Sequence, residues 1–219
     1  AAGRFARVPV LNGTNHDEER IFVTFGRAIS GGANVAVPEQ VTAGTYQADI
    51  AAVLGVPAAR AAGIAAQYPP AAYPSAAVAF STLVADASFA CPALDLDSRT
   101  AMRVPTFGYE FNDDAAPQIF VPSLIPPAVA THGSELQYLF DLPNAPVPGT
   151  LNAGQQALAG SMRAAWANFA ASGNPSTTAV PWPAFGHADR ASVLSLVSPR
   201  PQLETSFAAA HHCSFWAAG

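Results

Sequence analysis

A glutamate and a histidine that lie far apart in the chain could form the acid and base of a nucleophilic hydrolase. Glu18 ends the segment GTNHDE at residues 13–18, and His132 lies in the segment THGSEL at residues 131–136. A histidine acts as a general base when a neighbouring carboxylate holds its tautomer and stabilises the imidazolium ion. The motif that usually supplies the nucleophile, Gly-x-Ser-x-Gly, occurs nowhere in the 219 residues. The sequence thus contains a candidate acid and a candidate base without the serine motif that they would activate.

Each of the two candidate residues follows a predicted strand. The apolar run at residues 7–13 ends at a glycine and predicts a buried strand shortly before Glu18. A second strand is predicted over residues 104–111, after which a turn and a proline-rich loop at 117–127 lead to His132. In α/β-hydrolases the acid precedes the histidine in the chain, and both lie on loops after strands. The order and placement of Glu18 and His132 fit that arrangement.

Helical patterns fill much of the chain around these strands. The clearest spans residues 153–171, where apolar side chains recur at helical spacing until Gly173 stops the helix. A third strand is predicted at residues 192–196. The other predicted helices cover residues 44–54 with Thr45 as N-cap, residues 58–67, residues 76–90 after the cap Ser75 with Pro92 ending or kinking the helix, and a short terminal segment that begins near residue 205 and carries Cys213.

Strands that alternate with long helical stretches predict an α/β fold. About three strands are predicted, and they lie far apart in the sequence, so the sheet would have edges that need cover. No internal repeat and no linker divides the chain, and residues 1–219 are therefore interpreted as one unit.

The composition is apolar and mildly acidic. Half of the residues are hydrophobic and only 11% are charged, against about 25% in an ordinary soluble protein, which predicts that much surface is buried, in part against something outside this chain. The net charge of −5 and the lack of a basic cluster argue against a nucleic-acid partner. No uninterrupted apolar run reaches the roughly 18 residues that a membrane span needs. All ten basic residues are arginine, which with the high alanine content suggests a GC-rich bacterial gene.

Several segments, taken together, resemble the type-B carboxylesterases and lipases, the cholinesterase-like family. Residues 8–18 resemble the segment that carries the acid, residues 107–111 and 131–136 resemble the histidine segment, and residues 162–175 with the following Trp182-Pro183 are similar to a late helix and its continuation. The resemblance covers nearly the whole chain and implies the C-terminal part of an α/β-hydrolase domain. Residues 1–219 would then not fold autonomously. A missing N-terminal portion or a partner chain would complete the sheet and supply the serine and the oxyanion hole.

The resemblance also implies roles for particular residues. Glu18 matches the acid and His132 the base of a Ser-Glu-His triad that hydrolyses carboxylic esters through an acyl-enzyme, with no metal or organic cofactor. Asp17 is the neighbouring alternative for the acid, and Glu19 stands where the family usually has glycine. The alternative is that Asp17, Glu18 and Glu19 form a solvated acidic cluster without a catalytic role. Ile21 and Phe22 match positions that line the acyl and alcohol pockets, with ordinary core packing as their alternative.

The two cysteines, Cys91 and Cys213, match a disulfide pair of the family. That pairing implies an oxidising compartment and hence a secreted or extracytoplasmic protein, and two buried free thiols are the alternative. Neither cysteine suits the role of nucleophile. The residue after Cys91 is Pro92, which has no backbone N–H for an oxyanion hole, and Cys213 lies in a predicted helix rather than at a strand-to-helix turn.

The sequence favours neither a non-catalytic module nor a metal-binding protein. Relatives of this family serve as non-catalytic adhesion or interaction modules, which commonly lose members of the triad, whereas this chain retains Glu18 and His132. A metal site was not predicted, because the adjacent His211 and His212 would point in different directions on a helix and no ligand cluster accompanies them.

Overall fold

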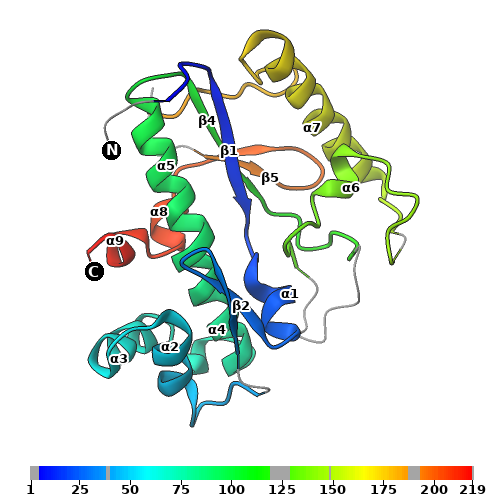
Figure 1. The fold of residues 1–219 in the computed structure, drawn as a ribbon. Helices are drawn as coiled ribbons and strands as arrows, with labels where there is room; N and C mark the ends of the chain where they lie inside the picture. The colour runs from blue at the N-terminus through cyan, green and yellow to red at the C-terminus, as the bar shows by residue number, and fades with distance from the viewer. Residues whose placement is uncertain (1–4, 38–39, 119–128, 148, 187–192, 219) are drawn as a thin grey trace.

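A four-stranded mixed sheet forms the centre of the molecule (Figure 1). The computed structural model describes residues 5–37, 40–118, 129–147, 149–186 and 193–218. The strands follow the order β1-β4-β5-β6, in which β1, β4 and β5 are parallel and β6 is antiparallel to β5. Their bounds are Val10–Asn15 for β1, Thr106–Phe111 for β4, Val193–Leu196 for β5 and Gln202–Glu204 for β6. The predicted α/β class is confirmed, and the three predicted strands are present; β6 had not been predicted.

The register between β1 and β4 brings the ends of the two strands to the same edge of the sheet. Asn15 pairs with Phe111 at that edge, and Gly13 pairs with Tyr109. A Cβ atom on Gly13 would lie 2.4 Å from the Tyr109 carbonyl oxygen, so this close approach requires glycine. Because parallel strands end together, the loop after β1 and the loop after β4 leave the sheet side by side.

The helix α7 (Ala153–Ser172) covers one face of this sheet. Asn152 and Gln155 form a capping box at its start, and Gly173 ends it with a left-handed φ of 74°. Leu158 and Met162 are fully buried in a core with aromatic and aliphatic side chains of β4 and β5. The prediction of a helix over residues 153–171 is confirmed. A short helix α6 (Leu136–Leu139) packs against α7.

The helix predicted after Ser75 continues past Pro92, the residue at which it was predicted to end or kink. Ser75 caps α4 (Ala76–Ala85) by accepting a hydrogen bond from the Val78 N–H at 3.2 Å. A π-helical turn (Asp86–Ala90) then leads directly into α5 (Cys91–Ala101). Pro92 lies at the start of α5, directly after this irregular turn, and irregular turns of this kind are where a continuous helix accommodates a residue that cannot donate its backbone N–H.

This continuous run, residues 76–101, is long and apolar enough to cross a membrane, and half of its most apolar part is buried inside the structure. The core helix of a globular fold can have the same length and composition, so the run is weak evidence for a span.

A second hydrophobic core lies beside the sheet, under α2 (Tyr46–Leu54) and α3 (Ala58–Gln67). The predictions of these two helices are confirmed. It also takes in α1 (Glu19–Thr24) and a hairpin of β2 (Arg27–Ser30) and β3 (Ala33–Ala36). The hairpin was not predicted; its two turn glycines, Gly31 and Gly32, have left-handed φ of 57° and 79°. A 3-10 turn (Pro70–Ala72) joins α3 to the segment before α4.

The predicted terminal helix is divided into α8 (Phe207–Ala210) and α9 (Cys213–Ala217). The break lies at His212, which has a left-handed φ of 51°. A disulfide bond joins Cys213 at the start of α9 to Cys91 at the start of α5. The C-terminal segment is therefore joined covalently to the long helix, which lies on the opposite side of the sheet from α7 (Figure 1).

Candidate active site

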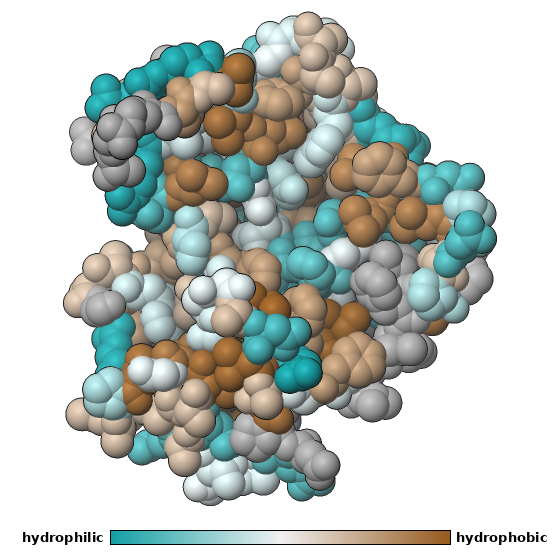
Figure 2. Space-filling model, viewed as in Figure 1, coloured by the Kyte–Doolittle hydropathy of each residue, from teal (hydrophilic) through white to brown (hydrophobic). Residues whose placement is uncertain are grey.

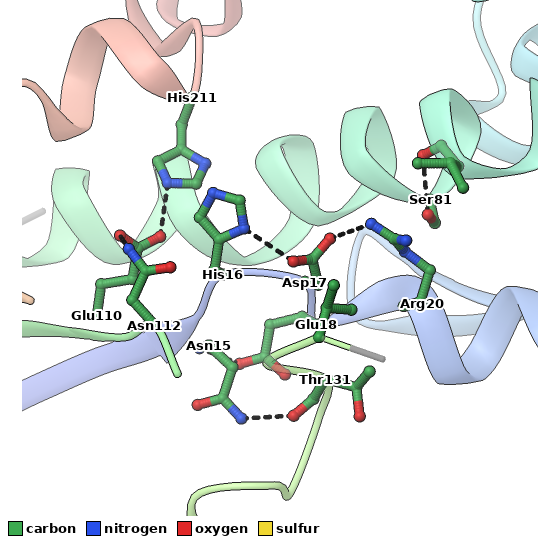
Figure 3. Close-up of polar contacts among 12 residues, drawn as sticks. Asn15, His16, Asp17, Glu18, Arg20, Ser81, Glu110, Asn112, Thr131 and His211 are labelled. Carbon is green, nitrogen blue, oxygen red and sulfur yellow. Dashed lines mark hydrogen bonds and ion pairs between the residues drawn. The ribbon is translucent and has the colours of Figure 1, made fainter. Parts of the chain in front are cut away.

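The loops after β1 and β4 meet at the sheet edge and bring residues 15–18 beside residues 130–135. Asp17 donates its backbone N–H to the Ala130 carbonyl at 3.0 Å and forms an isolated parallel bridge with Thr131. The Asn15 side chain donates to the Thr131 carbonyl at 2.7 Å (Figure 3). These contacts hold the two loops in register, and they place Glu18 and His132 opposite each other.

Glu18 and His132 form a direct hydrogen bond across 114 positions of sequence. The distance from His132 Nδ1 to Glu18 Oε2 is 2.6 Å. The other carboxylate oxygen of Glu18 accepts from the Asn15 N–H at 2.8 Å and from the Thr14 hydroxyl at 3.1 Å. With both oxygens bonded, the carboxylate has one orientation, and it fixes the orientation of the imidazole in turn.

Burial differs sharply between the two partners. The Glu18 side chain is 8% exposed, whereas the His132 side chain is 49% exposed. The hydrogen bond to Glu18 raises the pKa of His132 above its ordinary value, against the opposing effect of burial. In the part of the chain that the structure describes, Nε2 of His132 has no hydrogen-bond partner. The ring is thus oriented by a buried carboxylate and open on its other side.

The neighbouring acids are not a solvated cluster, because Asp17, Glu18 and Glu19 are all buried. Asp17 binds His16 and Arg20 instead of His132, with 2.9 Å between His16 Nδ1 and its Oδ2. Of the two acids considered for the pair, the structure therefore places Glu18 against the histidine. The solvated-cluster alternative is wrong, because the turn into α1 carries all three carboxylates into the interior.

Glu19 occupies the position where glycine had been expected. It is fully buried, and its Oε1 accepts the Ile29 N–H of β2 at 2.8 Å. Its Oε2 has no hydrogen-bond partner among the described residues. Burial raises the pKa of Glu19 to about 7. The carboxyl therefore ties the hairpin to α1 and is neutral over much of the acidic range.

The two predicted pocket residues lie in different environments. The Phe22 ring is partly exposed and its centroid lies 5.0 Å from that of the His132 ring, whereas Ile21 is buried at 8% exposure. Phe89, which had not been singled out, also lies beside His132 with its centroid at 6.0 Å. A cavity of about 710 Å³ opens elsewhere, beside the disulfide, and its lining includes neither Glu18 nor His132.

Ser134 lies two positions after His132, but its hydroxyl does not reach the imidazole. The side chain is buried, and Oγ donates to the Thr131 carbonyl at 2.8 Å. Glu135 next to it accepts a hydrogen bond from Asn15 at 2.5 Å. Both residues stabilise the turn that presents His132.

Comparison with known proteins identifies the family of the chain. The sequence model of the carboxylesterase family matches residues 1–216. The chain belongs to the carboxylesterase family. The resemblance to that family noted from the sequence is thereby confirmed.

Two curated carboxylesterase relatives are similar to parts of the chain. A cocaine esterase of Homo sapiens is 30% identical over 139 residues, which cover 63% of this chain and 24% of the relative. A pyrethroid hydrolase of Rattus norvegicus, Ces2e, is 31% identical over 112 residues, which cover 50% of this chain and 19% of the relative. The matched part thus spans a quarter or less of either relative.

A solved structure of a PNB esterase has the same fold over the shared part. It superposes with a TM-score of 0.64 at 24% identity and covers 93% of this chain and 37% of its own. This likeness confirms the α/β-hydrolase fold class, and the coverage is consistent with a chain that represents part of such a domain.

Proposed function

We propose that the protein hydrolyses carboxylic esters and that this chain supplies the acid and the base of a Ser-Glu-His triad. The observation that carries the proposal is the 2.6 Å hydrogen bond between His132 Nδ1 and a Glu18 carboxylate that is itself held by two donors. This is the arrangement that a triad needs, because it keeps the Nε2 lone pair of the imidazole on the side facing the nucleophile.

The two residues would act in sequence. His132 accepts the proton of a serine hydroxyl at Nε2 as the serine attacks the ester carbonyl, and it returns that proton to the leaving alcohol. Glu18 stabilises the imidazolium ion formed between these steps. In the second half of the reaction, His132 removes a proton from water, which releases the acid and restores the serine.

The serine and the oxyanion hole are proposed to lie on a segment outside these 219 residues. The sequence has no Gly-x-Ser-x-Gly motif, and the matched part spans 24% and 19% of the two curated relatives. Among the described strands, β1 pairs only with β4, so its second edge is free to accept a further strand. Residues 1–219 would be the C-terminal portion of one domain that is not autonomous.

The surface of the chain supports an interface of this kind. Figure 2 shows apolar side chains on both the upper and lower parts of the face viewed. Large exposed hydrophobic side chains include those of Phe25, Met102, Phe140 and Leu203. An interface that resembles a divided core buries such groups.

Phe22 is proposed to line the ester pocket, since its ring packs beside that of His132. Ile21 is a weaker candidate because it is buried among core residues. No part of the proposed chemistry needs a cofactor.

Labelling of the intact protein with a fluorophosphonate ester tests the proposal directly. We expect covalent labelling of a serine in a Gly-x-Ser-x-Gly peptide that is absent from residues 1–219, and loss of labelling in His132→Ala. Denaturing mass spectrometry would identify the polypeptide that carries the label. A single species near 22.5 kDa that neither labels nor cleaves a p-nitrophenyl ester would defeat the proposal and would favour a non-catalytic adhesion or interaction module.

The disulfide bond indicates the kind of compartment in which the protein is located. A bond between Cys91 and Cys213 forms and persists in oxidising compartments. We therefore propose a secreted or extracytoplasmic protein, in keeping with the bacterial coding bias inferred from the sequence.

A further inference from the structure

A second cluster of titratable side chains lies close to the Glu18–His132 pair but is separate from it. His16 follows β1, Glu110 belongs to β4, and His211 lies at the end of α8. One ligand atom from each of the three lies within 4.8 Å of the others. Figure 3 shows these side chains converging from three elements, with His16 turned away from Glu18.

Both histidines of this cluster are supported from behind by a carboxylate. His16 Nδ1 lies 2.9 Å from Asp17 Oδ2, and His211 Nδ1 lies 2.5 Å from Asp86 Oδ1. His211 Nε2 faces Glu110 Oε1 at 2.7 Å, and the second ring nitrogen of His16 points toward the His211 ring (Figure 3). Metal-binding histidines almost always have this support, because a carboxylate on one nitrogen fixes the tautomer and makes the other nitrogen a better ligand.

We propose that His16, Glu110 and His211 bind a divalent transition-metal ion, with Zn²⁺ as the best fit. Two imidazole nitrogens and one carboxylate oxygen form a ligand set typical of zinc. A three-ligand set leaves a fourth position for water, and the His16 side chain, at 38% exposure, gives that position access to solvent.

The charges around the cluster balance a divalent ion. Asp17, Asp86 and Glu110 contribute three negative charges, and Arg20, which binds Asp17, contributes one positive charge. With both imidazoles neutral, these groups sum to −2. A divalent cation bound between the two rings would neutralise this charge.

The rearrangement that binding needs is small. Bonds of about 2.0–2.1 Å in a tetrahedral site place ligand atoms roughly 3.3–3.4 Å apart. The His211–Glu110 pair, at 2.7 Å, would have to open by about 0.7 Å. The largest distance between two of the three ligand atoms is at most 4.8 Å. It would have to shorten by roughly 1.4 Å at most to reach the tetrahedral value. Side-chain rotation of the partly exposed His16 is sufficient for the larger change.

A bound ion would brace the site loop against the C-terminal segment. His16 lies two positions before Glu18, and His211 lies two positions before the disulfide-bonded Cys213. The sequence predicted no metal site because it offered only the adjacent pair His211 and His212. The structure turns His212 away to stack on Tyr68, with 4.7 Å between ring centroids, and supplies His16 and Glu110 from distant segments instead.

The test uses the intact protein, stripped with a chelator, free of affinity tags, and titrated with Zn²⁺ or with Co²⁺ as a spectroscopic substitute. We expect one ion per chain by elemental analysis, and visible ligand-field bands for the Co²⁺ form. His16→Ala should weaken binding beyond the roughly tenfold to hundredfold expected when a supporting carboxylate is lost, as in Asp17→Asn. The matched control His212→Ala removes an adjacent histidine and should leave the affinity unchanged.

The result that would overturn the proposal is equal Zn²⁺ affinity in the unaltered protein and His16→Ala, or no uptake at micromolar free Zn²⁺. If His16→Ala fails to fold, X-ray absorption of the wild-type zinc form decides the matter. Two imidazoles in the coordination shell would support the proposal, and a shell of oxygen ligands alone would refute it. None of these measurements depends on ester hydrolysis, so failure here leaves the proposed function untouched.

Discussion

The Asn15 side chain joins the two loops of the candidate active site: its amide nitrogen donates to the Thr131 carbonyl at 2.7 Å and to Glu135 Oε2 at 2.5 Å. Thr131 immediately precedes the histidine that pairs with Glu18, and the backbone N–H of Asn15 binds that same glutamate at 2.8 Å. One residue therefore contacts the acid through its backbone and the segment of the base through its side chain. The alignment of the pair depends on it.

Replacing Asn15 should misalign the pair without removing either member. We expect Asn15→Ala to lower kcat for a p-nitrophenyl ester by roughly tenfold to hundredfold, since a shift of about 1 Å in a catalytic group has that effect. Asn168→Ala is the matched control, because Asn168 makes two similar bonds to backbone carbonyls near the end of α7. An equal loss of kcat in both variants would mean that the effect is general destabilisation.

The identity of the acid can be tested by comparing two adjacent residues. Glu18→Gln should lower kcat/KM by roughly 10³- to 10⁴-fold, because the amide no longer stabilises the imidazolium or selects its tautomer. Asp17→Asn should cost far less, since Asp17 binds His16 and Arg20 rather than His132. Steady-state kinetics on both variants provide the measurement, and a reversed order of effects would identify Asp17 as the acid.

The pH dependence of kcat/KM should report the His132–Glu18 bond. The bond raises the pKa of His132, and only the neutral imidazole can accept the serine proton, so activity should fall as the pH drops through a value above the ordinary 6.5. In Glu18→Gln the remaining activity should fall only at a lower pH. An acidic limb at the same pH in both proteins would show that this hydrogen bond does not set the titration.

The disulfide should contribute strongly to stability. It closes a loop of 122 residues between Cys91 and Cys213, and loop-closure entropy predicts a contribution of about 4–5 kcal/mol to the free energy of unfolding. Denaturant unfolding of the Cys91→Ser, Cys213→Ser double variant would measure it. Reduction of the unaltered protein should give the same loss. The prediction would be contradicted if the double variant and the reduced protein had the same free energy of unfolding as the oxidised protein.

Glu19 should make stability depend on pH in the neutral range. Burial raises the pKa of Glu19 to about 7 in the folded state from an ordinary 4.5. Between pH 4.5 and pH 7, Glu19 is therefore ionised in the unfolded chain but still protonated in the folded protein. The free energy of unfolding therefore decreases as pH rises from about 4.5 to 7, and the cost is complete above 7.

Glu19→Gln removes this penalty and should be more stable than the unaltered protein at pH 8, by about 3 kcal/mol from the shift between 4.5 and about 7, with little difference at pH 4. Chemical denaturation at both pH values would measure the change. Glu204→Gln, which replaces a partly exposed glutamate of the strand β6, is the matched control. A constant difference at both pH values would show that Glu19 does not titrate as proposed.

Structural features that depend on neighbouring residues could be predicted from the amino-acid sequence. Ser75 and Asn152 cap their helices through their own side chains, and Gly173 ends α7 because it adopts a left-handed conformation without a steric cost. The placement of Glu18 and His132 after strands was predictable for the same reason, since short apolar runs mark those strands. The family resemblance extended these local signals to a shared fold.

Contacts between side chains that are distant in the sequence could be identified only from the fold. Asp17 and Glu18 are adjacent and chemically alike, and the choice of partner for His132 depends on how the turn after β1 faces the loop after β4. The His16–Glu110–His211 cluster was invisible for a similar reason, because its members come from the two ends and the middle of the chain. Strand register and packing across a hundred or more positions set these contacts, and no short-range pattern in a single sequence carries that information.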